Sequence, residues 1–197
     1  MDTTVKLTTK EYDQHITGGT PSNDEILIDQ GMYQRIIGKL LYLTVTRPDI
    51  AYSVETLSQF LLQSHMNAAL RIIRYIKGKP SQGLLMSSSK KDTLTTHCDA
   101  DWAACALSRK SITGFIIKLG DSFVSWKSKK QSTGSRSSAE SEYRSLVSTI
   151  AELTWLNGLI KDLGVQLQLP VTILSDSKAT LQITANPVYM RQQNTSR

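Results

Sequence analysis

The sequence predicts an α/β protein in which a helical segment precedes a mixed β-sheet whose later strands are joined by helices. Two observations lead to this prediction. Apolar residues recur at helical spacing over residues 30–78, and the spacing then changes to short runs typical of strands. The later order is three strands, a long helix, a strand and a helix, and a helical crossover of this kind joins parallel strands. With 197 residues the chain can bury a core without disulfides or metals.

The N-terminal part is expected to contain an arm and then a helical segment. Residues 1–24 are expected to form a flexible arm, because the Gly- and Ser-containing polar run at 18–24 cannot bury apolar surface. Residues 25–90 form the helical segment, with three short helices expected within 30–78. Pro48 fits the first turn of the second helix, where its missing N–H has no partner to lose, and Gly78 with Pro80 ends the third.

The sheet is expected to follow this segment. Gly120 and Asp121 form a two-residue turn between two strand-like runs, which indicates a hairpin. A long helical pattern then runs to Gly164, which is typical of a helix C-terminus. The expected strands are residues 84–87, 94–99, 113–119, 122–127 and 171–174, and the expected later helices are residues 138–163 and 177–184.

Composition excludes several classes of protein. No apolar run approaches the roughly 18 residues of a membrane span, and the N-terminus lacks the apolar segment of a secretory signal. We therefore expect an intracellular protein, in the cytoplasm or nucleus, with no membrane partner. Cys98 and Cys105 are too few for a disulfide scaffold and lack zinc-site spacing, so reduced thiols are expected. The net charge of +6 permits a polyanionic partner without requiring one.

Two aspartates follow or end expected strands. Asp99 ends one strand and Asp176 follows another. Carboxylates at the carboxyl ends of neighbouring strands converge in one crevice, where their oxygens can hold Mg²⁺. The alternatives are a helix N-cap for Asp176 and a loop-entry residue for Asp99.

Two glutamates lie at the start of the expected long helix, and their positions on it predict different roles. Ser137 and Glu140 have the spacing of a capping box, which gives Glu140 a local structural role. Glu142 lies four residues before Leu146 and so shares the helical stripe that faces the sheet. A carboxylate on a buried stripe must be paired, metal-bound or neutral. Glu142 is therefore the better candidate ligand.

A basic stretch with interleaved tryptophans lies between these acids. Lysine, arginine and glutamine side chains suit contacts to a phosphate backbone, and an indole suits packing against a sugar or base. The alternative is a solvated face with the tryptophans in the core. The candidate nucleic-acid-binding residues are Arg109, Lys110, Trp126, Lys127, Lys129, Lys130, Gln131 and Arg136.

Several motifs resemble one family. In the helical segment these are YQRIIGKLLYLT (33–44), TRPDI (46–50), LSQF (57–60) and RYIKG (74–78). In the later part they are CDADWA (98–103), RKS (109–111), TG (113–114), SWKSKKQ (125–131) and SSAESEY (137–143). The first set resembles the segment that follows the polymerase core in Ty1/copia-type retrotransposon polyproteins, which are common in plant genomes. The second set resembles the ribonuclease H domain of the same polyproteins.

The resemblance implies a fold, a substrate and a role for each acid. Residues 91–189 would form a ribonuclease H-like domain that cuts the RNA strand of RNA–DNA hybrids with two Mg²⁺ ions, for which Mn²⁺ is a possible substitute. By motif, Asp99 corresponds to the first catalytic aspartate, Glu142 to the helix glutamate and Asp176 to the second aspartate. Asp99 would bridge the two ions.

The resemblance also has departures. No polymerase metal-binding motif precedes Tyr33, so no polymerase activity is expected. After Tyr189 the family pattern ends, and residues 190–197 are interpreted as an aberrant tail from a frameshift or gene-model error. The domain is therefore expected to lack its last strand and its fourth catalytic acid, since no Asp or Glu follows Asp176. Weak hydrolysis is the expectation, and the alternative is an inactive nucleic-acid-binding remnant or a relic without a cellular function.

Overall fold

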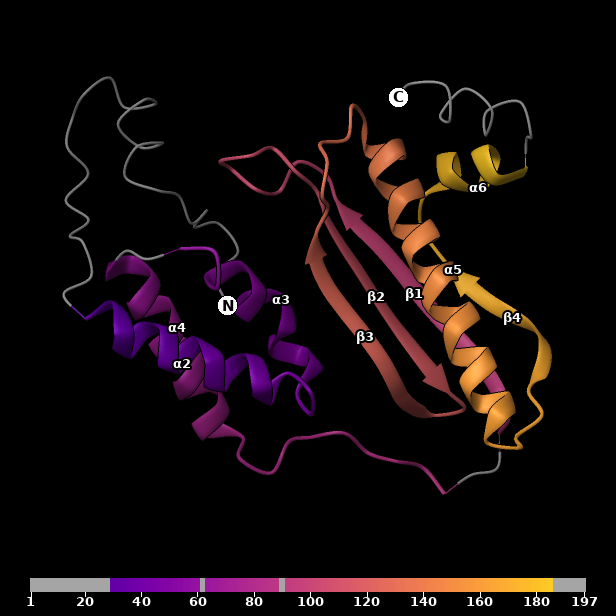
Figure 1. Cartoon of the computed structure of the whole chain (residues 1–197), viewed down its shortest axis with the longest axis horizontal. Coiled ribbons are helices and arrows are strands. Elements are labelled where there is room, and N and C mark those ends of the chain that lie inside the picture. Colours follow the sequence, from indigo (N-terminus) through magenta and orange to yellow (C-terminus); the bar gives the residue numbers. More distant parts are fainter. Residues whose placement is uncertain (1–28, 61–62, 89–90, 186–197) are drawn as a thin grey trace. The chain divides into compact units, whose positions relative to one another are not determined.

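The computed structural model describes residues 29–60, 63–88 and 91–185, which form two compact units that divide near Leu84 (Figure 1). The first unit holds α2 (Gln30–Leu43), the 3-10 helix η1 (Pro48–Ile50), α3 (Ala51–Leu57) and α4 (Gln63–Gly78). The second unit holds β1 (Thr93–Asp101), β2 (Ile112–Leu119), β3 (Ser122–Lys130), α5 (Ser138–Asp162), β4 (Gln168–Leu174) and α6 (Lys178–Ala185). The expected arm at 1–24 and tail at 190–197 lie outside the described residues.

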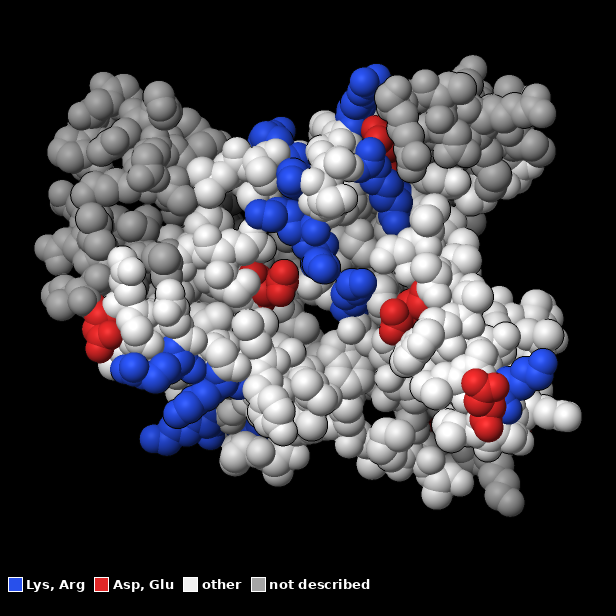
Figure 2. Space-filling view, viewed as in Figure 1, with Lys and Arg blue, Asp and Glu red and all other residues white. Residues whose placement is uncertain are grey.

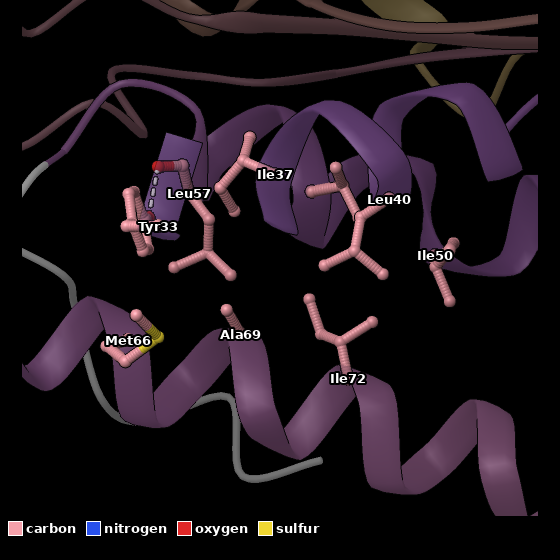
Figure 3. Packing of buried hydrophobic residues seen from close by; sticks show 9 residues of the cluster. Tyr33, Ile37, Leu40, Ile50, Leu57, Met66, Ala69 and Ile72 are labelled. Carbon is pink, nitrogen blue, oxygen red and sulfur yellow. Dashed lines mark hydrogen bonds between the residues drawn. The ribbon is translucent and has the colours of Figure 1, made fainter. Parts of the chain in front are cut away.

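The three expected helices of the first unit are confirmed. Asp29 caps α2 by accepting a 2.7 Å hydrogen bond from the backbone N–H of Met32. Pro48 opens η1 ahead of α3, where its missing N–H leaves no broken bond. Buried side chains from all three helices meet in one core (Figure 3). In that core the hydroxyl of Tyr33 donates a 2.7 Å hydrogen bond to the carbonyl oxygen of Leu57, and burial raises the pKa of Tyr33 to about 12.

An ion pair between a buried arginine and an exposed aspartate lies at the start of η1. Arg47 donates to both carboxylate oxygens of Asp49 at 2.9 and 2.8 Å, and its side chain is only 3% exposed. Arg47 also donates to the carbonyl oxygen of Lys79 and packs over the ring of Tyr75. The hydrogen bond from Arg47 is the main cause that lowers the pKa of Asp49, and the same bond raises the pKa of Arg47. The guanidinium is therefore paired with one carboxylate and also hydrogen-bonded to a backbone carbonyl.

The sheet has the strand order β3-β2-β1-β4, so β1 lies between two neighbours. β1 pairs antiparallel with β2 and parallel with β4, which confirms the mixed sheet expected from the helical crossover. The pairing with β4 runs only to His97, whereas the pairing with β2 continues to Asp101. Gly120 closes the β2–β3 hairpin with φ +57, and a Cβ there would lie 2.9 Å from Cβ of Lys91. Glycine is therefore the residue that this turn accepts.

Helix α5 lies along one face of the sheet (Figure 1). Leu146, Leu153, Leu156 and Ile160 on this helix pack against a core cluster that includes Phe115 and Ile117 of β2. Small polar residues at helical spacing share the buried face and allow close approach of helix and sheet: Ser141, Ser145 and Thr149 are all 0% exposed. This contact fixes the start of α5 beside the end of β1.

Some expected boundaries are wrong. The expected strand at 84–87 is absent: none of the described strands pairs with this segment, and Leu85 is 82% exposed. β1 continues two residues past Asp99, so Asp99 lies inside the strand rather than at its end. β3 continues through Lys130, which places the lysine run on the strand and not in the loop after it. The apolar pattern missed these extensions because pairing with β2, rather than burial, supports them.

Cys98 and Cys105 are both buried and free of disulfides. Among the described residues, none of the helices combines the length and the apolarity that crossing a bilayer requires.

Candidate functional site

Asp99 is positioned by β1. The side chains of this strand alternate between buried and exposed from His97 to Asp101, and Asp99 is on the exposed side. Its Oδ1 accepts a 2.8 Å hydrogen bond from the backbone N–H of Ala100, and its own carbonyl oxygen accepts one of 2.7 Å from Oγ of Ser145 on α5. The strand and the helix therefore both hold the Asp99 backbone.

Glu140 and Glu142 have the different surroundings that their spacing predicts. The backbone N–H of Glu140 donates to Oγ of Ser137, which caps α5. The Glu140 carboxylate accepts from the backbone N–H of Arg136 at 2.8 Å and pairs with Arg144 at 2.7 Å. All of these contacts are local, so Glu140 has a structural role at the helix start.

Glu142 instead lies partly buried beside Asp99, and its Oε2 is buried without a hydrogen-bond partner among the described residues. Burial is the main cause that raises the pKa of Glu142 to about 7, followed by the negative charge of Asp99. The charge of Asp176 acts in the same direction, and the backbone N–H of Ala100 acts against it. An orphaned carboxylate oxygen in this position is suited to receive a cation or a proton.

Asp176 follows β4 in the connection to α6 and is exposed. The N-cap alternative for this residue is wrong, because Oγ of Ser177 accepts the hydrogen bond from the backbone N–H of Thr180 at the start of α6. The carboxylate of Asp176 is therefore not required by the helix.

The three acids come together in one place. Carboxylate oxygens of Asp99, Glu142 and Asp176 all lie within 4.8 Å of one another. Within the described part of the chain, no lysine or arginine forms an ion pair with any of them. Two oxygens on opposite sides of one Mg²⁺ are about 4.2 Å apart, so this spacing is close to that of a shared cation. The geometry fits a hard divalent cation, and the catalytic roles of the three acids stay predictions.

The candidate nucleic-acid-binding residues occupy several kinds of position. Lys127 and Lys129 are exposed on β3, and Arg109 and Arg136 are exposed in the connections before β2 and before α5. Figure 2 shows cationic side chains gathered where β3 ends and α5 begins. Contact of these side chains with nucleic acid stays a prediction.

The other basic and aromatic candidates are partly buried. Nζ of Lys110 donates to the carbonyl oxygen of Ser132, and Nζ of Lys130 lies 3.9 Å from Sγ of Cys105. Trp126 is neither fully buried nor fully exposed. Lys110 and Lys130 thus make contacts inside the unit that a nucleic acid would have to share or replace.

Gln131 differs from the lysines beside it because its carboxamide makes contacts within the unit. Its Nε2 donates to the carbonyl oxygen of Ser141 at 3.0 Å and to Oγ1 of Thr113 at 3.1 Å. Its Oε1 accepts a 3.0 Å hydrogen bond from Ser135. The sequence interpretation missed these structural contacts, together with the bond from Ser145 to Asp99. The sequence does contain a pattern that indicates close contact between this helix and the sheet. Ser141, Ser145 and Thr149 are small polar residues spaced four apart on a helix face that is otherwise apolar.

Comparison with known proteins gives a consistent set of relatives. The chain is 40% identical over 166 residues to the "Retrovirus-related Pol polyprotein from transposon RE1" of Arabidopsis thaliana, covering 83% of this chain and 11% of that protein. It is 33% identical over 161 residues to the "Retrovirus-related Pol polyprotein from transposon TNT 1-94" of Nicotiana tabacum, covering 80% of this chain and 12% of that protein. The chain thus spans about a tenth of the length of these relatives.

A shorter relative is covered almost completely. The "Secreted RxLR effector protein 161" of Plasmopara viticola is 40% identical over 128 residues, which are 63% of this chain and 90% of that protein. No protein-family model and no solved structure matches the chain.

Proposed function

The chain belongs to the retrovirus-related Pol polyproteins of copia-type retrotransposons, and on this basis we propose that its sheet unit is a ribonuclease H that hydrolyses the RNA strand of RNA–DNA hybrids. The observation that carries the proposal is the group of three carboxylates within 4.8 Å, one of which has a buried oxygen with no hydrogen bond in the described structure. Purely structural carboxylates are normally paired or solvated, as Glu140 is paired here.

The sheet order supports a ribonuclease H-like fold for this unit. The unit has an antiparallel hairpin beside the central strand β1, and a long helix crosses over to the parallel strand β4. The three acids lie on β1, on α5 and after β4. This is the arrangement that the family resemblance implies for its catalytic residues. The fold assignment is part of the proposal.

Asp99, Glu142 and Asp176 are the residues that would hold two Mg²⁺ ions, and Mn²⁺ is the expected substitute. The bound ions would supply Lewis acidity that activates water and stabilises the leaving oxygen of the cleaved strand. The chain contributes a fixed cluster of negative charge, in which Ser145 and Ala100 orient Asp99 through the two hydrogen bonds described above. Glu142 must lose its proton to bind a cation, and its raised pKa makes that loss pH-dependent near neutrality.

Exposed cations of the sheet unit would bind the phosphate backbone of the hybrid. Lys127, Lys129, Arg109 and Arg136 have exposed side chains suited to this contact, and Trp126 offers a partly exposed indole. Because such contacts release counterions, we expect hybrid affinity to fall steeply with salt.

Hybrid cleavage by the wild type beside Asp99→Asn tests the catalytic proposal. We expect slow cleavage in Mg²⁺, because Mg²⁺ demands near-ideal octahedral geometry and three protein carboxylates leave much of that shell to water and substrate. Cleavage should be faster in Mn²⁺ and absent in Asp99→Asn. Asp92→Asn, which changes an exposed aspartate just before β1, is the matched control. Cleavage that survives in Asp99→Asn contradicts the assignment.

Hybrid binding is measured separately by electrophoretic shift at two salt concentrations. Lys129→Ala should weaken binding and reduce the salt dependence, whereas Lys161→Ala, which removes an exposed lysine from the last turn of α5, should not. Salt-sensitive binding without cleavage in either metal would favour an inactive nucleic-acid-binding protein. Absence of binding at low salt would contradict the proposed substrate.

A further inference from the structure

We infer that Gln131 is a positioning residue, which sets Glu142 against Asp99 by tying the first turn of α5 to β2. The inference rests on the proposed function, because it concerns how that metal site is held together. It changes the role of a residue that the sequence placed among the nucleic-acid contacts.

The carboxamide of Gln131 uses both of its donor protons and an acceptor position inside the unit. Nε2 donates to the carbonyl oxygen of Ser141 and to Oγ1 of Thr113 at 3.0 and 3.1 Å, and Oε1 accepts from Oγ of Ser135 at 3.0 Å. The backbone N–H of Gln131 donates to the carbonyl oxygen of Ser111 at 2.8 Å, which anchors the residue beside β2. A residue with this set of partners would have to break internal hydrogen bonds before its Nε2 could donate to a phosphate.

The partners of Gln131 lie next to the acids of the site. Ser141 immediately precedes Glu142 and is 0% exposed. Thr113 lies opposite Ala100 in the β1–β2 register, one position from Asp99. A single carboxamide thus joins the backbone beside Glu142 to the strand that pairs with the Asp99 region.

A second connection holds the same two parts together. Oγ of Ser145, one helical turn after Ser141, donates to the carbonyl oxygen of Asp99 at 2.7 Å. The helix is therefore attached to the sheet on both sides of Glu142, once through Gln131 and once directly. Glu142 lies between these two attachments.

The site needs such attachments because its acids repel one another. The neighbouring charges of Asp99 and Asp176 both disfavour an ionised Glu142. Without a fixed backbone, the start of α5 could relax away from β1, and the oxygens would no longer converge on one cation. Residues that orient metal ligands commonly change metal affinity by about 10- to 100-fold when they are removed.

The test is Mn²⁺ binding measured by electron paramagnetic resonance on the full chain, for the wild type, Gln131→Ala and the matched control Gln166→Ala. Gln166 is exposed in the connection between α5 and β4. We expect Mn²⁺ affinity to fall about tenfold in Gln131→Ala and to stay unchanged in the control. Hybrid affinity should be unchanged in both variants, and raising the Mn²⁺ concentration should restore cleavage by Gln131→Ala.

Thr113→Val provides a second variant in case Gln131→Ala does not fold. It removes one acceptor of the Gln131 carboxamide, keeps the shape of the side chain and leaves the bond to Ser141 intact. A smaller loss of Mn²⁺ affinity in the same direction supports the inference.

The outcomes separate the inference from the proposed function. Wild-type Mn²⁺ affinity in a folded Gln131→Ala or Thr113→Val overturns the positioning role and leaves the ribonuclease H proposal standing. Weaker hybrid binding at unchanged Mn²⁺ affinity also overturns it, since that result identifies a substrate contact. A cleavage loss that high Mn²⁺ does not restore indicates general structural damage and counts against positioning. A wild-type chain that neither binds Mn²⁺ nor cleaves the hybrid overturns the proposed function, and the inference with it.

Discussion

Buried charge is compensated in the helical unit and uncompensated in the sheet unit. In the helical unit, Arg47 is almost completely buried, but it is paired with Asp49 through two hydrogen bonds, bonded to a backbone carbonyl and packed on Tyr75. In the sheet unit, Glu142 is partly buried with one oxygen lacking a partner among the described residues, and its charged neighbours are two further carboxylates. One unit compensates its buried charge internally, and the other does not.

This difference distinguishes charge that supports a fold from charge that serves a site. A compensated pair keeps both partners ionised, as the lowered pKa of Asp49 and the raised pKa of Arg47 indicate. The uncompensated cluster has the opposite effect, because it raises the pKa of Glu142 toward neutrality. Only the second arrangement gains stability when a cation binds.

The largest expected effect comes from breaking the compensated pair. Asp49→Asn leaves the buried guanidinium of Arg47 without its charge partner, and because Asp49 itself is exposed to water we expect a loss of about 2–3 kcal/mol, below that of a fully buried pair. Chemical denaturation followed by circular dichroism measures the loss, which should appear in the transition that reports the helical unit. A loss below about 1 kcal/mol would show that the pair has no special role.

Removing the uncompensated charge should have a smaller effect of opposite sign. Below pH 4.5 Glu142 is protonated in the folded and unfolded chains, whereas above pH 7 the folded chain must hold it ionised. Without metal, Glu142→Gln should therefore stabilise the protein at pH 8 by about 1–2 kcal/mol, less than the full pKa shift because water still reaches the carboxyl. At pH 4 the variant should match the wild type.

Thermal melting of the wild type and Glu142→Gln at pH 4 and pH 8 measures this stabilisation, and repeating it at pH 8 with Mg²⁺ tests its cause. Mg²⁺ should raise the melting temperature of the wild type at pH 8 and leave that of Glu142→Gln nearly unchanged. Equal Mg²⁺ shifts in the two proteins would mean that the cation binds elsewhere.

Sequence accounts for much of the fold because its helices and hairpin depend on local patterns. The expected helices of the first unit agree with α2, α3 and α4, and the turn at Gly120 agrees with the β2–β3 hairpin. The prediction of a strand at 84–87 is wrong because an apolar run forms a strand only where a neighbouring strand offers hydrogen bonds. None of the described strands pairs with Leu85.

The sequence also predicts the three acids of the site, but not the residues that position them. Glu142 could be distinguished from Glu140 because a carboxylate on the sheet-facing stripe is unusual and a capping box is recognisable. Gln131 and Ser145 donate to carbonyl oxygens that are distant in the sequence, and every residue has a carbonyl oxygen. Such partners follow from the three-dimensional register and not from residue type.

A neutral contact should have an intermediate effect. Ser137→Ala removes the cap of α5 and should destabilise the sheet unit by about 1 kcal/mol. Because the cap bond is between uncharged groups, the loss should be the same at low and high salt. A strongly salt-dependent loss would indicate that the ion pair of Glu140 with Arg144, rather than the cap, holds the helix start.

The smallest effect is expected for an exposed ion pair. Lys91 and Asp121 are joined at 2.9 Å, but their side chains are 59% and 57% exposed. Asp121→Asn should change the free energy of unfolding by at most about 0.5 kcal/mol, since exposed pairs contribute little. This variant makes the same chemical change as Asp49→Asn, so the ratio of the two losses measures how much burial matters.

The unequal pairing of β1 has a consequence for amide hydrogen exchange. From Thr95 to His97 the strand has neighbours on both sides, whereas from Cys98 to Asp101 the only described partner is β2. Protection from exchange should therefore fall along the strand, with Asp99 just past the step. Within the described part of the chain, the backbone of Asp99 is therefore hydrogen-bonded along one edge only, so solvent and ligand can reach the acid while the interior of the sheet stays closed.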